Sequence, residues 1–305
     1  MSFDKLIRRT TELKNPTVAG LDPSFDSLPS FIKEKAVKEF GTSLEAAAAA
    51  ILAFNCGLID ALYDIVPAVK PQCAYYELLG WQGVHVLAET IKYAQSKGMF
   101  VITDGKRNDI GSTMEAYAQA HLGEVEIAGV KLQPFAADAL TVNGYLGTDG
   151  IAPLLKVCEK FDRGIFVLVK TSNPSSGELQ DRLIDGIPVY ERMGGLCETW
   201  GGRTDSGYSA VGAVVGATYP QQLRELREKL PHTFFLVPGY GAQGGKAADV
   251  ALAFDENGSG AIVNSSRAIM YAYKKEGCDE QDYAQAARRE AIRMRDEING
   301  FLNGK

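Results

Sequence analysis

The sequence predicts a single α/β domain over residues 1–305, folded as a (β/α)8 (TIM) barrel with insertions after strands 1 and 5 and a C-terminal helix. Eight short apolar or β-branched segments alternate with longer helical patterns, which is typical of a parallel sheet. The chain of 305 residues has room for a barrel of about 250 residues plus insertions, and no change in composition marks a second domain. A doubly wound sheet also alternates strands and helices, but the count of eight strands favours the barrel.

The predicted strands are runs of about four to seven residues with the continuous apolar character of strands buried on both faces. They comprise residues 17–21, 66–70, 99–103, 139–142, 164–169, 211–215, 233–237 and 260–263. The predicted helices comprise residues 44–63, 81–96, 113–121, 151–158, 189–200, 220–229, 246–254 and 281–302. The surplus falls at residues 23–41 and 175–208, after strands one and five. Both insertions follow strand C-termini, where barrel enzymes build their sites, and the second is a candidate lid or interface element.

The composition is that of an ordinary soluble globular protein, with 46% hydrophobic and 23% charged residues. A net charge of −6 and the lack of a basic stripe argue against a nucleic-acid partner. No apolar run approaches the roughly 20 residues of a membrane helix, and the N-terminus lacks the apolar core of a signal peptide. The five cysteines show no metal-ligand spacing, so we expect free thiols and no metal site. Since the sequence shows neither a membrane helix nor a signal peptide, we expect a cytoplasmic protein without membrane association.

Polar residues end almost every predicted strand, and the third strand is the most informative. The two-residue period of a strand places Asp104 and Lys106 on the same side, toward the barrel mouth, with Asp109 on the turn that follows. Lys70, at the end of the second strand, can reach the same mouth and complete an alternating Lys-Asp-Lys-Asp array. A lysine held among carboxylates stays protonated, so Lys106 is a poor Schiff-base nucleophile and a good fixed cation and proton donor. The alternative is an ion-pair cluster that only stabilises the barrel top.

A glycine-rich run, PGYGAQGG at residues 238–245, follows the seventh strand and opens a helix. Glycines let backbone amides approach an anion, and a helix N-terminus favours negative charge. Arg267, beyond the eighth strand, can add a bidentate phosphate contact, and strands seven and eight are where barrels commonly hold phosphate. The pattern predicts a phosphate site. A tight glycine-rich connection without a ligand is the alternative.

The run DGKRNDIGST at residues 104–113 resembles the D-x-K-x-x-D-I-x-x-T signature of the orotidine 5′-phosphate decarboxylases, in the longer, mainly bacterial branch of that family. The other family residues occur in the expected order from the first strand to the eighth. One position departs from the pattern: Ser266 precedes Arg267 where many relatives have glycine, a change that leaves a backbone amide contact intact. The resemblance implies a barrel that converts orotidine 5′-monophosphate (OMP) to uridine 5′-monophosphate (UMP) and CO2 in de novo pyrimidine biosynthesis, without a cofactor.

The resemblance also implies roles for the charge network. Lys106 would donate a proton to C6 of the pyrimidine as CO2 leaves, and Asp104 would lie near the departing carboxylate. Lys70 would bridge the aspartate network and the ribose. Asp109 would reach the active site of the neighbouring subunit, so the resemblance implies a homodimer with shared active sites.

A second group of residues is implied to bind substrate. Asp22 would bind the ribose hydroxyls, Ser172 would contact the amide edge of the pyrimidine, and Thr113 would reach the neighbouring subunit's site. Gln243 and Arg267 would hold the 5′-phosphate. The full group comprises Asp22, Ile110, Thr113, Ser172, Pro238, Gln243, Gly244 and Arg267.

Two other functions stay open. A Mg²⁺-dependent sugar-phosphate decarboxylase or synthase of the same barrel superfamily carries a similar D-x-K-x-x-D run, but has an acid where Lys70 stands here. The interleaved lysines also argue against a dication among Asp22, Asp104 and Asp109. A non-catalytic barrel that binds a phosphate ligand needs only the glycine-rich run and Arg267, which would leave the lysine–aspartate array without a task.

Overall fold

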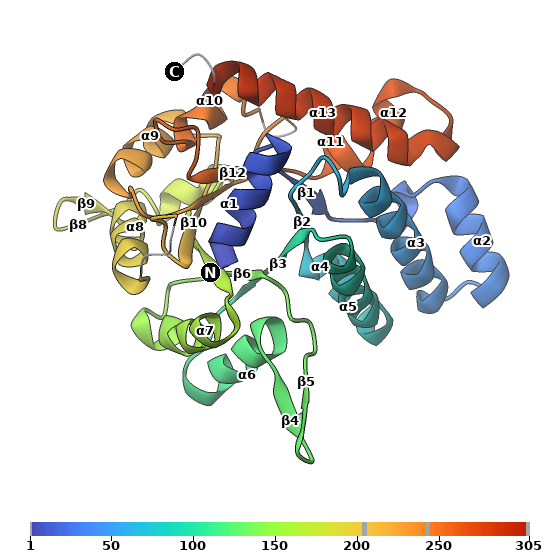
Figure 1. Ribbon diagram of the computed structural model, residues 1–305, viewed down its shortest axis with the longest axis horizontal. Coiled ribbons are helices and arrows are strands. Elements are labelled where there is room, and N and C mark those ends of the chain that lie inside the picture. The colour runs from blue at the N-terminus through green and yellow to red at the C-terminus, as the bar shows by residue number, and fades with distance from the viewer. Residues whose placement is uncertain (1, 203–205, 242–243, 303–305) are drawn as a thin grey trace.

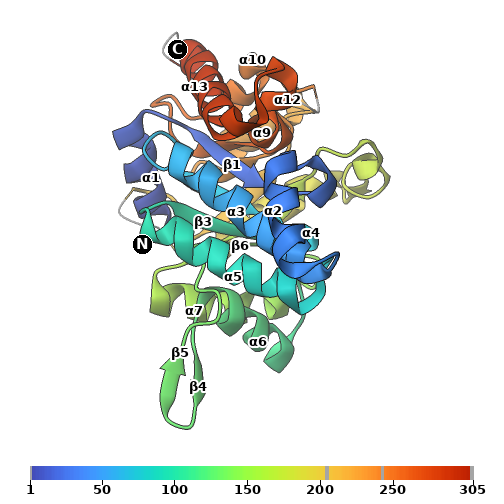
Figure 2. The same ribbon diagram turned by 90° about the vertical axis from the view of Figure 1, so that its right-hand side faces the viewer.

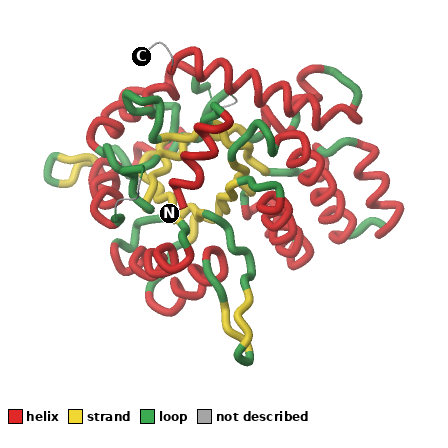
Figure 3. Tube along the Cα trace, viewed as in Figure 1, coloured by secondary structure: helices red, strands yellow, loops and turns green. Residues whose placement is uncertain are grey.

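The computed structural model describes residues 2–202, 206–241 and 244–302. At its centre is a closed barrel of eight parallel strands, in the order β1-β12-β11-β10-β7-β6-β3-β2, surrounded by helices (Figures 1 and 3). The barrel strands are β1 (Thr17–Leu21), β2 (Ala68–Pro71), β3 (Phe100–Arg107), β6 (Ala139–Val142), β7 (Gly164–Lys170), β10 (Val211–Val215), β11 (Phe235–Val237) and β12 (Ala261–Ser265). The predicted barrel and its eight strands are therefore confirmed, with strand ends shifted by up to a few residues.

Each predicted helix is present near its expected place. The helices are α3 (Leu44–Leu62), α5 (Gly80–Ser96), α6 (Gly111–Leu122), α7 (Thr148–Phe161), α8 (Val189–Trp200), α9 (Pro220–Lys229), α10 (Ala247–Val250) and α13 (Tyr283–Leu302). The helix expected at 246–254 is split, because α10 gives way to the 3-10 helix η3 (Ala251–Ala253). Short helices join these elements: α4 (Cys73–Glu77), α11 (Arg267–Met270), α12 (Ala272–Glu276) and η4 (Glu280–Asp282).

The segments after β1 and β7 carry structure of their own. The first holds η1 (Phe25–Ser27) and α2 (Ser30–Phe40), and the second holds η2 (Pro174–Glu178) and the hairpin of β8 (Leu183–Ile184) and β9 (Ile187–Pro188). A further hairpin, β4 (Val125–Ile127) and β5 (Val130–Leu132), was not predicted. It projects from the body between α6 and β6 (Figures 1 and 2).

An unpredicted helix, α1 (Ser2–Leu13), closes the N-terminal end of the barrel (Figure 1). Its Phe3 and Leu6 are fully buried in the cluster that fills the barrel interior. The Phe3 ring lies 4.8 Å from the ring of Phe166 and 5.6 Å from that of Phe234, measured between centroids. Because this end of the barrel is filled with apolar side chains, the opposite end, at the strand C-termini, is left to hold polar groups.

Helix α3 corrects one expectation from the sequence. Its 19 residues have a mean hydropathy of 1.5, so it is long and apolar enough to cross a membrane by length and composition alone, although no run of that kind was expected. In the fold it packs between α2 and α5 over the barrel (Figure 1) and buries 56% of its apolar window. The many small residues, including the run of five alanines from residue 46, allow this close helix packing.

The ring of His121, near the end of α6, makes folding stability depend on pH. It is 4% exposed and stacks on Phe135 with centroids 5.1 Å apart. Burial, with a smaller contribution from the charge of Arg107, lowers the pKa of His121 from 6.5 to about 4. Between these values the unfolded chain binds a proton that the folded chain does not, so stability falls as the pH drops from 6.5 to 4. We expect His121 to lower the free energy of unfolding by roughly 3 kcal/mol over that pH range, as measured by urea unfolding at pH 7 and pH 4.

The substitution His121→Phe keeps the aromatic stack and removes the titrating group. The variant should therefore lose about 3 kcal/mol less than the wild type between the two pH values. His85→Gln, at an exposed position of α5, serves as the control and should behave as the wild type does. Parallel stability curves for the wild type and His121→Phe would contradict the assignment.

Candidate active site

A cavity of about 480 Å³ opens at the C-terminal end of the barrel. Leu168, Val214 and Leu236, on three neighbouring strands, contribute apolar side chains to its lining. One polar wall comes from the first strands of the chain and comprises Asp22, Lys70, Gln72, Asp104, Lys106 and Thr141. The facing wall comprises Thr171, Ser172, Asn173, Pro238, Gly239, Tyr240, Asn264, Ser265, Ser266, Arg267 and Ala268. The polar ends of strands far apart in the sequence therefore meet at one mouth, as predicted.

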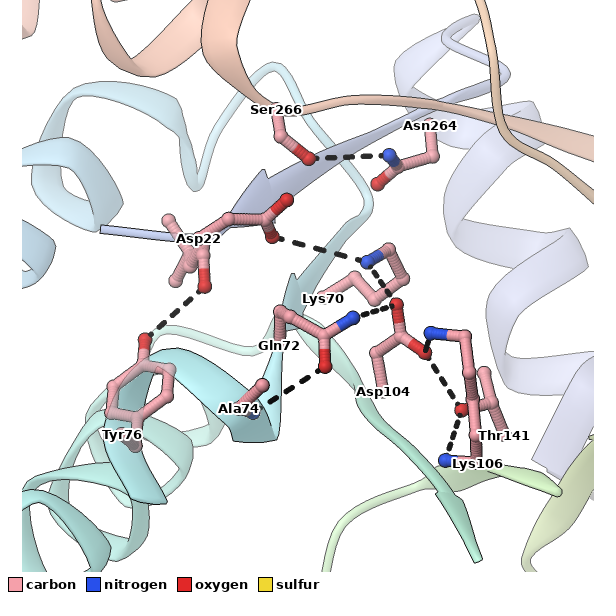
Figure 4. Close-up of polar contacts among 11 residues, drawn as sticks. Asp22, Lys70, Gln72, Ala74, Tyr76, Asp104, Lys106, Thr141, Asn264 and Ser266 are labelled. Atoms are coloured by element: carbon pink, nitrogen blue, oxygen red, sulfur yellow. Dashed lines mark hydrogen bonds and ion pairs between the residues drawn. The ribbon is translucent and has the colours of Figure 1, made fainter. Parts of the chain in front are cut away.

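Four charged side chains form a continuous network on the first wall (Figure 4). Lys70 Nζ lies 2.7 Å from Asp104 Oδ2 and 4.0 Å from Asp22 Oδ1. Lys106 Nζ lies 2.6 Å from Asp104 Oδ1. The strands β1, β2 and β3 are parallel neighbours, so residues at their C-terminal ends are brought together. Within one chain the order is thus Asp22–Lys70–Asp104–Lys106.

Two further side chains hold Asp104, and neither was predicted as a site residue. Gln72 Nε2 donates to Asp104 Oδ2 at 2.9 Å, and Thr141 Oγ1 donates to Asp104 Oδ1 at 2.8 Å. The Thr141 hydroxyl also accepts the backbone N–H of Lys106 at 3.0 Å. The alternation of β6 was a usable signal, because Ala139 lies in the cluster inside the barrel and Thr141 shares its side of the strand. With these bonds the carboxylate has a fixed orientation.

The network keeps both of its buried members charged. Burial alone would raise the pKa of Asp104, but Lys70 and Lys106 together outweigh it and hold that pKa well below its usual range. Burial would likewise lower the pKa of Lys70, but Asp104 and Asp22 outweigh it and raise that pKa above its usual range. At neutral pH the wall is therefore an array of fixed positive and negative charges.

Lys106 sits in a strained part of β3. Its φ is 48°, a left-handed value that is uncommon for a residue other than glycine. The pairing register between β3 and β6 shifts in the same place, between Thr103 and Arg107. Such strain costs on the order of 1–3 kcal/mol and is found mostly at functional sites. The predicted meeting of Asp104 and Lys106 is confirmed, but a bulge rather than a regular strand brings the two together.

On the facing wall Arg267 stands at the start of α11 and lines the cavity. Among the described residues, its guanidinium makes no hydrogen bond or ion pair, which leaves it able to bind an anion. Asn264 Nδ2 donates to the neighbouring Ser266 Oγ at 3.3 Å (Figure 4). Ser266 depends on Gly20 of β1, because a Cβ at residue 20 would lie 1.9 Å from Ser266 Oγ. The serine that departs from the family pattern is thus accommodated by a glycine on the adjacent strand.

The other predicted site residues divide into three groups. Ser172 and Pro238 line the cavity, whereas Gly244 is not among its lining residues. Gln243 lies outside the described residues. Asp109, Ile110 and Thr113 follow β3 at the start of α6 and do not line the cavity of their own chain. Ile110 is 53% exposed, and Asp109 Oδ1 accepts the backbone N–H of Ile110 at 2.8 Å.

Comparison with known proteins assigns the chain to a family. The model of the orotidine 5′-phosphate decarboxylase / HUMPS family matches residues 51–278. The chain belongs to this family. It is 48% identical to an orotidine 5′-phosphate decarboxylase of Rhodopirellula baltica, over 93% of this chain and 94% of the relative. A Clostridium tetani protein of the same name is 41% identical over the full length of both chains.

A solved structure of Leishmania donovani OMP decarboxylase has the same fold. It superposes with a TM-score of 0.71 at 28% identity and covers 97% of this chain and 98% of its own. The relatives also confirm the mainly bacterial branch that the signature indicated. The predicted family and enzyme class are confirmed: the chain is a carboxy-lyase of the orotidine 5′-phosphate decarboxylase family.

Removing the carboxylate of Asp104 should destabilise the folded protein. In Asp104→Ala the buried Lys70 ammonium would keep only Asp22, 4.0 Å away, so its charge would be poorly compensated. Breaking a buried pair from one side costs about 3–5 kcal/mol, and we expect a loss of this size in the free energy of unfolding measured with urea.

The double variant Lys70→Met/Asp104→Leu removes both charges and should recover at least about half of that loss. The surface pair Lys92–Glu89, 2.9 Å apart on α5, supplies the control, and Lys92→Met should cost less than about 1 kcal/mol. An Asp104→Ala protein within about 1 kcal/mol of the wild type would show that the network is not needed for stability.

Proposed function

We propose that the chain decarboxylates OMP to UMP and CO2, in the synthesis of pyrimidine nucleotides. The observation that carries this proposal is the Lys106 ammonium, held 2.6 Å from a buried carboxylate at the wall of a nucleotide-sized cavity. Arg267 lies in the same cavity, on the wall that comes from the last strands. A cation and a phosphate anchor on opposite walls suit a substrate whose reacting carbon is remote from its phosphate.

Lys106 supplies the proton in the proposed reaction. The bond between C6 and the carboxylate carbon breaks, CO2 leaves, and the electron pair stays on C6. The Lys106 ammonium stabilises this developing negative charge and then transfers a proton to C6. Water returns a proton to the amine, so the sum is OMP and one proton giving UMP and CO2. Asp104 lies beside the departing carboxylate and holds Lys106 in position for the transfer.

The remaining residues bind the substrate. Arg267, together with Gln243, takes the 5′-phosphate, and Pro238 and Gly244 belong to the same phosphate loop. Ser172 contacts the amide edge of the pyrimidine. Asp22 takes the ribose hydroxyls, and Lys70 links them to Asp104. Because the phosphate is far from C6, its binding energy is available to fix the pyrimidine against the charge network.

The charge network also bears on the Mg²⁺-dependent alternative. A dication bound by Asp22 and Asp104 would have to take the place of the Lys70 ammonium, which already lies between them. Among residues 2–202, 206–241 and 244–302, no three His, Cys, Asp or Glu side chains are grouped as metal ligands. The phosphate-binding barrel without catalysis is less favoured, because it gives no task to the strained Lys106.

We also propose that the enzyme is a homodimer with shared active sites. Asp109, Ile110 and Thr113 lie outside the cavity of their own chain, on an exposed turn at the start of α6. From there they reach the cavity of a second copy, where Asp109 joins the network at Lys106. One chain by itself therefore lacks part of its site.

Mixing two inactive variants tests the shared site. Lys106→Ala and Asp109→Ala homodimers should each be inactive. After exchange of subunits, half of the dimers are mixed and each has one intact site, so we expect about one quarter of wild-type turnover. A mixture that stays inactive, although light scattering and labelled subunits show that mixed dimers have formed, would contradict the sharing of Asp109.

The main test is the change in ultraviolet absorbance when OMP is added to the protein in EDTA. We expect full turnover without metal, because the ammonium of Lys106 supplies the positive charge that stabilises the negative charge developing at C6. No turnover of OMP would overturn the proposal. Activity that disappears with EDTA and returns with Mg²⁺ would favour the sugar-phosphate enzymes.

Lys106→Ala separates catalysis from binding in the same assay. Turnover should fall by about 10⁴-fold, the upper end of the range for a lost proton donor, whereas UMP binding measured by calorimetry should stay within about tenfold of the wild type. Unchanged turnover would remove Lys106 from the proposed mechanism.

A further inference from the structure

Lys170, the last residue of β7, is a buried cation that the proposed reaction does not use. We propose that it is a positioning residue: its ion pair with Asp181 pins the segment after β7 to the barrel and so holds Ser172 at the cavity wall. The inference rests on the proposed function, because Ser172 is the residue through which Lys170 would act on the pyrimidine.

The surroundings of Lys170 are built for a cation. Its side chain is 0% exposed, and its Nζ lies 2.7 Å from Asp181 Oδ1. The same Nζ lies 4.5 Å from the ring centroid of Tyr219 and 5.7 Å from that of Tyr190. Gln222 Nε2, on α9, donates to the same Asp181 oxygen at 3.1 Å. An ammonium buried this deeply must be paired, so Asp181 is held in place by the cost of leaving Lys170 alone.

Asp181 belongs to the insertion and Lys170 to the barrel, so their pair joins the two. The segment between them, residues 171–180, leaves β7 and includes η2. Its far end is tied down by Tyr190, whose backbone N–H donates to the carbonyl of Gln180 at 2.9 Å. The ion pair therefore closes a loop of ten residues onto the strand from which it starts.

A second clamp lies beside the first. Gln180 Oε1 accepts the backbone N–H of Thr171 at 2.9 Å, and Gln180 Nε2 donates to the Thr171 hydroxyl at 2.8 Å. One side chain of the insertion thus holds both the backbone and the side chain of the residue that precedes Ser172. The two clamps are neighbours, because Lys170 and Thr171 are adjacent at the end of β7 and their partners Asp181 and Gln180 are adjacent in the insertion.

Ser172 is also confined from the opposite side, by the loop after β10. A Cβ at Gly216 would lie 2.9 Å from Ser172 Cβ and 3.0 Å from its backbone nitrogen, so the two loops are in close contact. Thr218 Oγ1 donates to the Ser172 carbonyl at 3.2 Å. Ser172 therefore has little freedom as long as the insertion stays closed.

This arrangement gives the insertion a task. Ser172 lines the cavity into which Lys106 projects, so the position of the serine sets how a bound pyrimidine faces that ammonium. Misplacement of a binding group by about 1 Å can cost up to about 100-fold in rate. The insertion after β7, predicted as a lid or an interface element, thus acts as a strap that is fixed to the barrel beside Ser172.

A double-mutant cycle tests the coupling. We expect Lys170→Met to lower kcat/KM for OMP by at least about tenfold in the wild-type background. In the Ser172→Ala background the same substitution should lower it by less than about threefold, because the residue through which it acts is gone. Lys170→Arg keeps a cation opposite Asp181 and should recover part of the loss. Equal factors in the two backgrounds would overturn the inference, since a general loss of stability acts equally in both.

Two further variants keep the test informative if Lys170→Met folds poorly. Gln180→Leu breaks the second clamp without burying a charge, and it should show the same dependence on Ser172. The control is Lys229→Met, which breaks a pair of equal length, 2.7 Å between Lys229 and Glu191, on the outside of α8 and α9. Its kcat/KM should stay within about twofold of the wild type, which corresponds to a change of less than about 0.5 kcal/mol in the activation free energy.

Hydrogen exchange measured by mass spectrometry gives a readout that needs no turnover. The amides of residues 171–180 should exchange faster in Lys170→Met than in Lys229→Met, and unchanged exchange would overturn the pinning of the segment. Absence of OMP turnover in the wild type would instead overturn the proposed function, so the two failures are distinguishable.

Discussion

The mouth of this barrel depends on the compensation of one desolvated ammonium, that of Lys70. A buried lysine is tolerated only with opposite charge beside it, which Asp104 provides at 2.7 Å and Asp22 at 4.0 Å. This requirement ties β1, β2 and β3 together at their C-terminal ends. Asp104 then has a second oxygen for Lys106, so the residue that balances the buried cation also orients the proposed acid. Stability and catalysis are in this way assigned to the same carboxylate.

The N-terminal end of the barrel is apolar and stabilises the fold, whereas the C-terminal end is polar and costs stability. Apolar side chains of α1 fill the N-terminal end and supply burial free energy without polar groups. The C-terminal end can then hold desolvated charges and a strained residue at Lys106, both of which cost stability. The side chains of Leu168, Val214 and Leu236, which line the cavity, belong to or pack against the same interior cluster as Phe3 and Leu6.

The same solution to a buried cation recurs on the other side of the mouth. Lys170 is fully buried at the end of β7, Lys70 is buried near the end of β2, and each is balanced by an aspartate from another segment. At Lys70 the partner comes from a neighbouring strand, and the result is a charge array facing the cavity. At Lys170 the partner comes from an insertion, and the result is a fixed strap. A buried lysine therefore acts here as an anchor whose effect depends on which segment carries the aspartate.

Local patterns in the sequence determined much of this protein. Buried-strand runs predicted the barrel, and the signature around Asp104 and Lys106 predicted the family. The period of two predicted that Asp104 and Lys106 meet, although an irregularity in β3 is what brings them together. Contacts between distant segments were decided only by the tertiary structure. Gln72 and Thr141 bind Asp104 across strand boundaries, α1 plugs a barrel that begins after it, and Asp181 folds back onto Lys170. Periodicity and propensity describe neighbours along the chain, whereas these contacts follow from strand order, register and the need to compensate buried charge, which exist only once the barrel has closed.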